Sequence, residues 1–306
     1  MLELREIGPD IFLLKISVPL NVASVNLYIF RGEVPTLLDA GTNTPAVYED
    51  IQAGLKQLGI KHLDQVIATH WHVDHAGGTD SLAQEGARIL IGARDYEEWS
   101  GFVRGETFDM FQQWAELEWG VPRDELSTML KVYDRLRRLA SLPDEVEKIG
   151  AGEVLRAGNT SLKAIFTPGH TAGHLSFYEE ENSLLFSGDM LLPDQVSYPG
   201  IWLDSGQVVS GLPSYMNSLD VLEGLGPKEY FPAHGVPQGK SVARCQEVRA
   251  QILKQVERFT PQAMVYEGAL QLSKGKINPG VMFIQLHYVY GWEKLKEELD
   301  SLKNLV

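Results

Sequence analysis

The sequence predicts an α/β fold in which helices and strands form layers. Three patterns carry this prediction. Apolar and polar residues alternate from Ile11 to Leu38, a helical segment is indicated from Thr44 to Leu58, and a short apolar run follows from Leu63 to Ala68. A succession of strand, helix and strand is typical of layered α/β proteins.

The amino-terminal elements have recognisable boundaries. The alternating segment is interrupted at Asn21, Gly32 and Pro35, which predicts two or three antiparallel strands. Thr44-Pro45 opens the first helix, because proline is favoured in the first helical turn, and Gly59 closes it.

The next elements continue the α/β rhythm. The run Leu63–Ala68 is bounded by polar residues and predicts a buried strand. A helix near 79–86 and a strand at 88–91 come next. Further strands are expected beyond residue 148, at 161–167, 175–178 and 183–186.

Residues 95–148 break this rhythm, with apolar residues at helical spacing and three of the six tryptophans. They predict a helical insertion, whose aromatic side chains either pack the insertion itself or line a substrate pocket as a lid. We expect residues 1–240 to form one catalytic domain that includes this insertion. Residues 241–306 are then a small, mostly helical carboxy-terminal segment.

Composition limits the classes of partner. The chain has 306 residues, 44% of them hydrophobic and 22% charged, and a net charge of −14. Phosphate backbones require a basic face, so this acidic balance disfavours nucleic acid as the partner and favours a small-molecule substrate. Residues 241–306 carry nine Lys/Arg against seven Asp/Glu, a net charge of only +2.

The sequence also bears on location. Cys245 is the single cysteine, so no intrachain disulfide can form, which fits a reducing cytoplasm. The first residues lack the basic-then-apolar pattern of a signal peptide, and no run of about 20 apolar residues predicts a membrane span. We therefore expect a cytoplasmic protein. The aromatic insertion is compatible with a homodimer interface.

The run from Thr69 to His75 carries the most chemical information. It places four metal-competent side chains within six residues: His70, His72, Asp74 and His75. Neutral imidazole and carboxylate are ligands that zinc and its first-row neighbours prefer. The run follows a predicted strand and precedes Gly77-Gly78, so it lies on a turn that can direct several side chains to one point.

Four shorter motifs place Asp or His in a turn, three of them rich in Gly or Pro after an apolar or strand-like run. They are Leu37–Gly41 with Asp39, Thr167–His174 with His170 and His174, Ser187-Gly188-Asp189, and Pro232–Gly235 with His234. Each is weak alone. Together they predict convergence of side chains from different strands at one edge of a sheet.

These residues resemble the metallo-beta-lactamase superfamily, in motif order over residues 11 to 240. The family's His-x-His-x-Asp-His signature is met in full at 70–75. The resemblance implies a four-layer αββα sandwich with the metals at one edge of two packed sheets. Within the family, the sequence looks most like the hydroxyacylglutathione hydrolase branch. It also resembles a branch with a winged-helix-like carboxy-terminal segment.

The resemblance also implies a ligand set. One metal ion would be held by His70, His72 and His170, and a second by Asp74, His75 and His234. Asp189 would bridge the two ions, which makes Asp74 and Asp189 the catalytic carboxylates. Asp39 would support the site without binding metal. His174 either orients a ligand from behind or is a hydrogen-bonded core histidine.

Two divalent ions about 3.5–4 Å apart share a hydroxide and polarise the scissile carbonyl or phosphoryl oxygen. Zinc is the expected metal, and iron or manganese accept the same nitrogen and oxygen ligands. We therefore predict a dinuclear hydrolase of a small-molecule thioester, ester or lactone, with an acyl-bearing substrate.

Three alternatives remain at this stage. The first is a phosphodiesterase or endoribonuclease of the same superfamily, with residues 241–306 binding nucleic acid. The others are a non-catalytic member with a closed pocket and an iron-dependent redox enzyme.

Overall fold

A seven-stranded sheet forms one half of the centre of the molecule. The computed structural model describes residues 3–20, 24–106, 127, 131, 133–197, 199–204, 207–236 and 241–256. The strands of this sheet are adjacent in chain order: β1 (Glu3–Gly8), β2 (Ile11–Ile16), β3 (Val25–Phe30), β4 (Thr36–Leu38), β5 (Gln65–Ala68), β6 (Arg88–Gly92) and β7 (Glu147–Ile149). Strands β1 to β4 pair antiparallel, and β4 to β7 pair parallel.

A five-stranded sheet packs against the first one. Its order is β14-β11-β10-β9-β8. Its strands are β8 (Val154–Ala157), β9 (Thr160–Phe166), β10 (Leu175–Glu179), β11 (Leu184–Gly188) and β14 (Glu229–Pro232). Strands β11 and β14 are parallel, and the other pairs are antiparallel. A separate hairpin joins β12 (Ile201–Asp204) to β13 (Gln207–Ser210).

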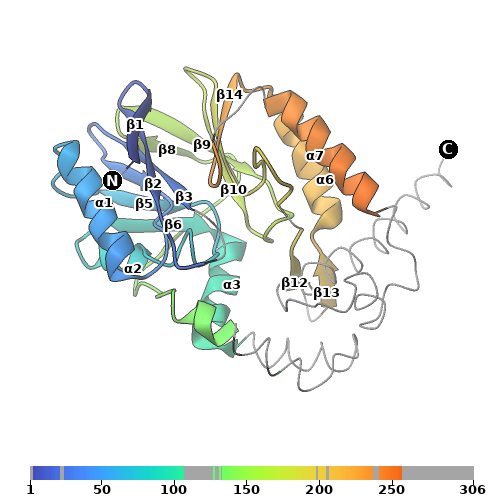
Figure 1. The fold of residues 1–306 in the computed structure, drawn as a ribbon, viewed down its shortest axis with the longest axis horizontal. Coiled ribbons are helices and arrows are strands. Elements are labelled where there is room, and N and C mark those ends of the chain that lie inside the picture. Colours follow the sequence, from blue (N-terminus) through green and yellow to red (C-terminus); the bar gives the residue numbers. More distant parts are fainter. Residues whose placement is uncertain are drawn as a thin grey trace.

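Helices cover the outer faces of both sheets (Figure 1). Those of the first half are α1 (Pro45–Gln57), α2 (Thr79–Ala83) and α3 (Ala93–Arg104), and those of the second are α6 (Leu212–Leu225) and α7 (Ser241–Val256). Within the described ranges, none of these helices is long and apolar enough to cross a membrane.

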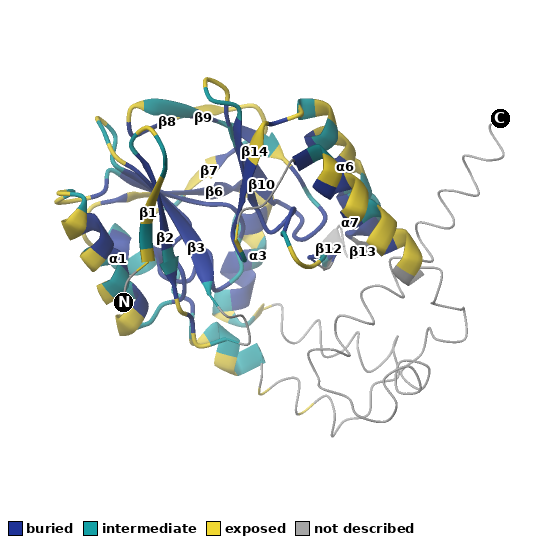
Figure 2. Cartoon of the chain, turned by 45° about the horizontal axis from the view of Figure 1, so that its top comes forward, coloured by how far each residue is buried: buried dark blue, intermediate teal, exposed yellow. Residues whose placement is uncertain are grey.

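Three apolar clusters hold the layers together. Between the sheets, Tyr28 of β3 packs edge-to-face on Phe186 of β11, with ring centroids 5.0 Å apart. A second cluster lies between α1 and the first sheet, and a third joins α6 and α7 to the second sheet. Figure 2 shows the consequence: buried residues fill the centre, and the outer faces of α6 and α7 are exposed. The predicted αββα sandwich is confirmed.

Local sequence explains the first helix and its neighbours. Pro45 stands in the first turn of α1, where its missing N–H costs no helical hydrogen bond. The buried side chains Val47, Ile51 and Leu55 recur every four residues, so they form one apolar face against the sheet. Gly59 follows with a φ of 72°, which ends the helix.

Sequence reasoning gave no range for β12, β13 or β14, and it missed the weakly patterned strands β1, β7 and β8. Their side chains are mostly exposed or half-buried, because each lies at or next to a sheet edge. Such strands carry little apolar patterning, so the sequence gives a weak signal for them.

The predicted insertion at 95–148 and the winged-helix-like segment remain predictions. Within 95–148 the described residues include most of α3 and a helical stretch at 133–137, and residues 107–126 lie outside the described part. Of 241–306, only α7 is described, and residues 257–306 also lie outside it. Helix α7 packs Cys245, Val248 and Ile252 into the same apolar cluster as α6.

Candidate metal centre

All the predicted ligands lie at one edge of the two sheets. His70 to His75 follow β5, Asp189 follows β11, and His234 follows β14, while His170 lies in the loop between β9 and β10. Parallel strands end at the same edge, and β11 and β14 are such a pair. The topology therefore brings the predicted motifs of the two sheets to a common point.

Three histidines form the first group of facing donors, which we call half-site A. Nδ1 of His72 lies 3.1 Å from Nε2 of His70 and 3.0 Å from Nε2 of His170. Two ligand atoms at about 2.0–2.1 Å from one tetrahedral ion lie about 3.3 Å apart. The spacing of these nitrogens therefore fits a shared metal ion.

The second group, half-site B, consists of Asp74, His75 and His234, whose donor atoms all lie within 4.8 Å of one another. Oδ2 of Asp74 is 3.4 Å from Nε2 of His234 and 3.7 Å from Nε2 of His75. All three side chains are buried. Two imidazoles and one carboxylate in a buried site again form a set suited to zinc, iron or manganese.

Asp189 faces both half-sites with different oxygens. Its Oδ2 lies 3.4 Å from Nε2 of His170 in half-site A. Its Oδ1 lies 3.4 Å from Nε2 of His234 and 3.8 Å from Nε2 of His75 in half-site B. One carboxylate is thus placed between the two groups, as the bridging prediction requires.

Where the Nε2 atom of a histidine faces the centre, its other ring nitrogen, Nδ1, has a hydrogen-bond partner. Nδ1 of His234 donates to the carbonyl of Ser24 at 2.7 Å, and Nδ1 of His170 is 2.7 Å from the hydroxyl of Ser197. Nδ1 of His70 is 3.0 Å from the hydroxyl of Thr69. These contacts fix the ring orientations and direct Nε2 at the centre, which is the nitrogen that would bind a metal ion.

Asp39 is buried behind half-site B, where it accepts three hydrogen bonds. Thr69 donates to it from its backbone N–H at 2.8 Å and from its hydroxyl at 3.0 Å. Nδ1 of His75 donates to its Oδ2 at 2.9 Å. Because the Thr69 hydroxyl donates to Asp39, its oxygen accepts from His70, so one carboxylate orients both histidines. A supporting role for Asp39, as the resemblance implied, stays a prediction that these contacts favour.

His174 forms a directed chain of hydrogen bonds behind Asp189. The backbone N–H of Asp189 donates to Nε2 of His174 at 3.2 Å, so Nδ1 carries the proton and donates to Thr167 at 2.9 Å. The Thr167 hydroxyl then donates to Ser176, which donates to the carbonyl of Ser187. This contact with Asp189 supports the orienting role over the purely structural one.

Two buried polar atoms of the centre have no hydrogen-bond partner in the described part of the chain. They are Nε2 of His75 and Oδ1 of Asp189. An unpaired buried nitrogen or carboxylate oxygen costs about 1–3 kcal/mol or more. A bound ion that accepts electron pairs from both atoms removes this cost, so the residues present fit a metal centre.

The carboxylates control the charge of the two histidines in half-site B. Burial lowers the pKa of His75, but Asp74, Asp39 and Asp189 outweigh it and raise that pKa to about 8. Burial likewise lowers the pKa of His234, and the Asp189 carboxylate and the hydrogen bond to Asp74 raise it to about 10. Without metal, both imidazoles are therefore doubly protonated and positively charged at neutral pH.

Two other buried histidines, His70 and His174, show the opposite behaviour. Burial, reinforced by neighbouring imidazoles, holds the pKa of His70 well below its usual range, and the same holds for His174. Both are fully buried and neutral, which agrees with their hydrogen bonds.

These shifts predict how the chelated protein responds to pH. A histidine whose pKa is raised in the folded state stabilises that state fully below the pKa of the unfolded chain, about 6.5. This stabilisation is lost as the pH rises through the folded-state pKa, about 8 for His75 and about 10 for His234. The lowered pKa values of His70 and His174 reduce the free energy of unfolding as the pH falls below about 6.5, because the unfolded chain then binds more protons. We expect the free energy of unfolding of the chelated chain to be greatest near pH 6.5.

Denaturant titrations of loaded and chelated protein between pH 5 and 10 test this. The loaded protein should keep its stability on the alkaline side, because ions replace the protons on His75 and His234. An equal alkaline loss in both forms contradicts the assignment.

Sequence reasoning did not find the residues that hold the histidines from behind. Ser24 and Ser197 come from loops that carry no metal-binding pattern. Loop 190–197, which carries Ser197, is fixed by Arg244 of α7. The Arg244 guanidinium donates to the carbonyls of Leu192 at 2.6 Å and Gln195 at 2.9 Å.

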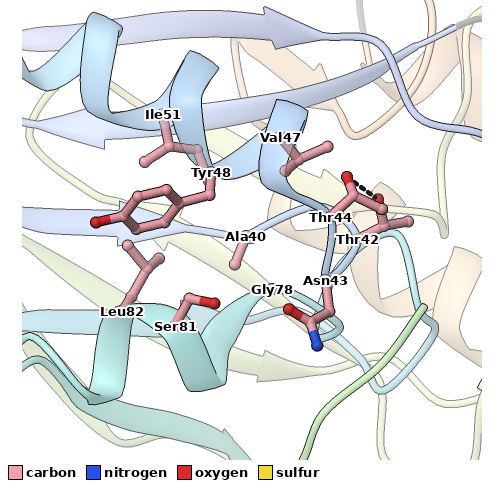
Figure 3. A pocket seen from close by; sticks show the side chains of 10 residues that line it. All are labelled: Ala40, Thr42, Asn43, Thr44, Val47, Tyr48, Ile51, Gly78, Ser81 and Leu82. Carbon is pink, nitrogen blue, oxygen red and sulfur yellow. Dashed lines mark hydrogen bonds between the residues drawn. The ribbon is translucent and has the colours of Figure 1, made fainter. Parts of the chain in front are cut away.

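A small cavity lies near the centre but is separate from it. It is lined by residues of α1 such as Tyr48 and Ile51 and residues of α2 such as Leu82 (Figure 3). Its volume of about 10 Å³ has room for no more than about one water molecule. It does not serve as a substrate pocket.

Comparison with known proteins identifies the family of this chain. The family model described as "Metallo-beta-lactamase superfamily" matches residues 20–234. The probable metallo-hydrolase YqjP of Bacillus subtilis is 28% identical over 238 residues, which is 74% of this chain and 72% of that protein. The lactamase-like protein aptB of Emericella nidulans is 28% identical over 220 residues, 71% of this chain and 53% of that protein.

Two solved structures have a fold similar to that of this chain. The metallo-beta-lactamase family protein TTHA1429 from Thermus thermophilus is 26% identical, with a TM-score of 0.82 over 95% of this chain and 94% of its own. A beta-lactamase domain protein from Burkholderia ambifaria shares the fold, with a TM-score of 0.79 at 20% identity over 95% of this chain and 87% of its own.

Proposed function

Because this chain belongs to the metallo-beta-lactamase superfamily and has His/Asp groups able to bind metal, we propose that it is a dinuclear hydrolase. Half-site A (His70, His72 and His170) holds one divalent ion, and half-site B (Asp74, His75 and His234) holds the other. Asp189 bridges them. Zinc is the proposed metal, because every ligand is an imidazole or a carboxylate.

The observation that carries this proposal is the placement of the Asp189 carboxylate. Its Oδ2 lies 3.4 Å from half-site A at His170, and its Oδ1 lies 3.4 Å from half-site B at His234. A carboxylate that served a single ion would not need both oxygens directed at separate donor groups.

When bound, the two ions supply Lewis acidity, lowering the pKa of a water molecule and polarising the scissile bond. The chain's own residues keep that acidity available. Five imidazoles are neutral donors, so only Asp74 and Asp189 offset the charge of the ions. The partners at Thr69, Ser197 and Ser24 hold Nδ1 and so direct the Nε2 atoms at the ions, and Asp39 and His174 hold the surrounding backbone.

We propose a thioester, ester or lactone of a small acyl-bearing molecule as the substrate. Beside half-site A, the half-buried Trp71 ring packs on Phe102, with centroids 5.0 Å apart, and Phe102 packs on Tyr133 at 4.8 Å. This aromatic cluster favours apolar ligand groups. The net charge of −14 disfavours a polyanionic substrate.

The proposed setting is the cytoplasm, where the buried free thiol of Cys245 stays reduced. Burial raises the pKa of this thiol to about 12, so it is chemically inert at neutral pH. A homodimer remains part of the proposal as a prediction from the sequence.

The test combines metal analysis with a turnover screen. The panel contains an acyl thioester, a lactone, bis-para-nitrophenyl phosphate and a short RNA, each assayed with loaded and chelated protein. We expect about two zinc ions per chain and turnover of the thioester or lactone that chelation abolishes. Cleavage confined to the phosphodiester or RNA supports the nuclease alternative, and iron without hydrolysis contradicts the proposal.

A further inference from the structure

One buried carboxylate joins the two loops that form half-site A. His70 and His72 lie in the loop after β5 of the first sheet, and His170 lies in the loop between β9 and β10 of the second sheet. Their facing nitrogens lie 3.0–3.1 Å apart, so a small shift between the sheets opens the group. Asp95, in the first turn of α3, contacts both loops.

The Asp95 carboxylate is fully buried and accepts three hydrogen bonds. Its Oδ2 accepts from the backbone N–H of Trp71 at 3.0 Å and from the hydroxyl of Thr171 at 2.7 Å. Its Oδ1 accepts from the backbone N–H of Gly173 at 2.6 Å. Trp71 stands between two histidines of one loop, and Thr171 directly follows the histidine of the other. The carboxylate therefore ties both loops directly beside the histidines of half-site A.

The backbone around Asp95 is built for this contact. A Cβ added to Gly173 would lie 2.3 Å from the Asp95 nitrogen and 2.6 Å from its Oδ1, so only glycine permits the approach. The first turn of a helix also favours a negative charge. Helix α3 is fixed to the core by Trp99, which is completely buried, so the carboxylate has a rigid base.

Half-site B has anchors of its own. Asp39 holds His75, and the carbonyl of Ser24 holds His234. We propose that Asp95 is a positioning residue for half-site A alone, setting the distance between its two loops and hence its affinity for a metal ion. This inference rests on the proposed two-ion function.

Asp95→Asn is the most informative change, because it keeps the size of the side chain. Its amide offers one acceptor oxygen and one NH₂ group. In one orientation the NH₂ faces the backbone N–H of Trp71 and releases the loop after β5. In the other it faces the backbone N–H of Gly173, and the loop between β9 and β10 keeps only its bond from Thr171. Loss of a partner behind a metal ligand typically lowers metal affinity about 10–100-fold.

Two variants, each with one half-site disabled, allow the metal affinity of the other half-site to be measured by itself. Asp74→Ala leaves only half-site A complete, and His72→Ala leaves only half-site B complete. Full-length variants are loaded with Zn²⁺, and the ions are withdrawn with increasing concentrations of a chromophoric chelator. Adding Asp95→Asn should weaken the remaining site about 10–100-fold in the Asp74→Ala background and change it less than about twofold in the His72→Ala background.

Asp80→Asn is the matched control. Asp80 also lies in the first turn of a helix, and its carboxylate accepts a hydrogen bond from Ser141 at 2.8 Å, away from the metal centre. It should alter neither affinity. If Asp95→Asn does not fold, Thr171→Val keeps the carboxylate and removes one of its three donors, with a smaller loss expected at the same half-site.

The outcomes are distinguishable. If neither background holds an ion before Asp95 is changed, the two-ion function is contradicted, and this inference with it. If both backgrounds hold an ion and Asp95→Asn weakens neither, or weakens both equally, the two-ion function stands and the positioning role of Asp95 is overturned.

Discussion

Replacing Asp189 with alanine is expected to lower metal content and turnover together, with turnover falling at least about 100-fold. Losing a partner behind a ligand already costs about 10–100-fold, and Asp189 faces both half-sites directly through separate oxygens. Its removal also leaves His75 and His234 without one of the carboxylates that compensate positive charge. Metal analysis and steady-state kinetics on the active substrate measure the effect.

The matched control is Asp220→Ala on α6. Asp220 pairs with Arg249 at 2.5 Å on the surface, where ion pairs contribute only about 0–1 kcal/mol. This variant should keep its metal and its turnover. If Asp189→Ala keeps full activity with one ion or none, the dinuclear proposal is wrong.

Replacing Gly169 with alanine is expected to destabilise the protein and displace His170, its neighbour. Gly169 has a φ of 140°, which a side chain rarely permits. An added Cβ would lie 2.4 Å from the Cα of Tyr215, a backbone atom of α6 that cannot rotate away. Backbone strain and overpacking each cost about 1–3 kcal/mol, so we expect a total of about 2–6 kcal/mol.

Gly224→Ala in the same helix provides the control. No atom lies within 4 Å of a Cβ at that position, and Gly224 is within α6. Alanine is a better helix former than glycine by about 0.5–1 kcal/mol, so this variant should be as stable as the original protein or more so. Thermal unfolding and metal content distinguish the two glycine variants. Equal stability of both contradicts the packing argument.

Much of the fold follows from patterns that are local in the sequence. The alternation from Ile11 to Leu38 became β2, β3 and β4, and the helix expected from Thr44 to Leu58 is α1. Edge strands such as β1 and β8 were not predicted, because a strand with one exposed face and one free edge has little apolar periodicity.

By itself the sequence predicted which residues form the proposed donor set. His70, His72, Asp74 and His75 are close in the chain, so any turn there holds them near one another. The later motifs each add one proposed ligand: His170, Asp189 and His234. The family resemblance already implied how these donors divide into two half-sites, and the tertiary structure added how they are oriented. Which oxygen of Asp189 faces which half-site depends on how the two sheets pack. The same packing sets which nitrogen of each histidine is held from behind by Ser24, Ser197 or Asp39. These contacts join residues up to 210 positions apart, and only the closure of the sandwich brings them within hydrogen-bond distance.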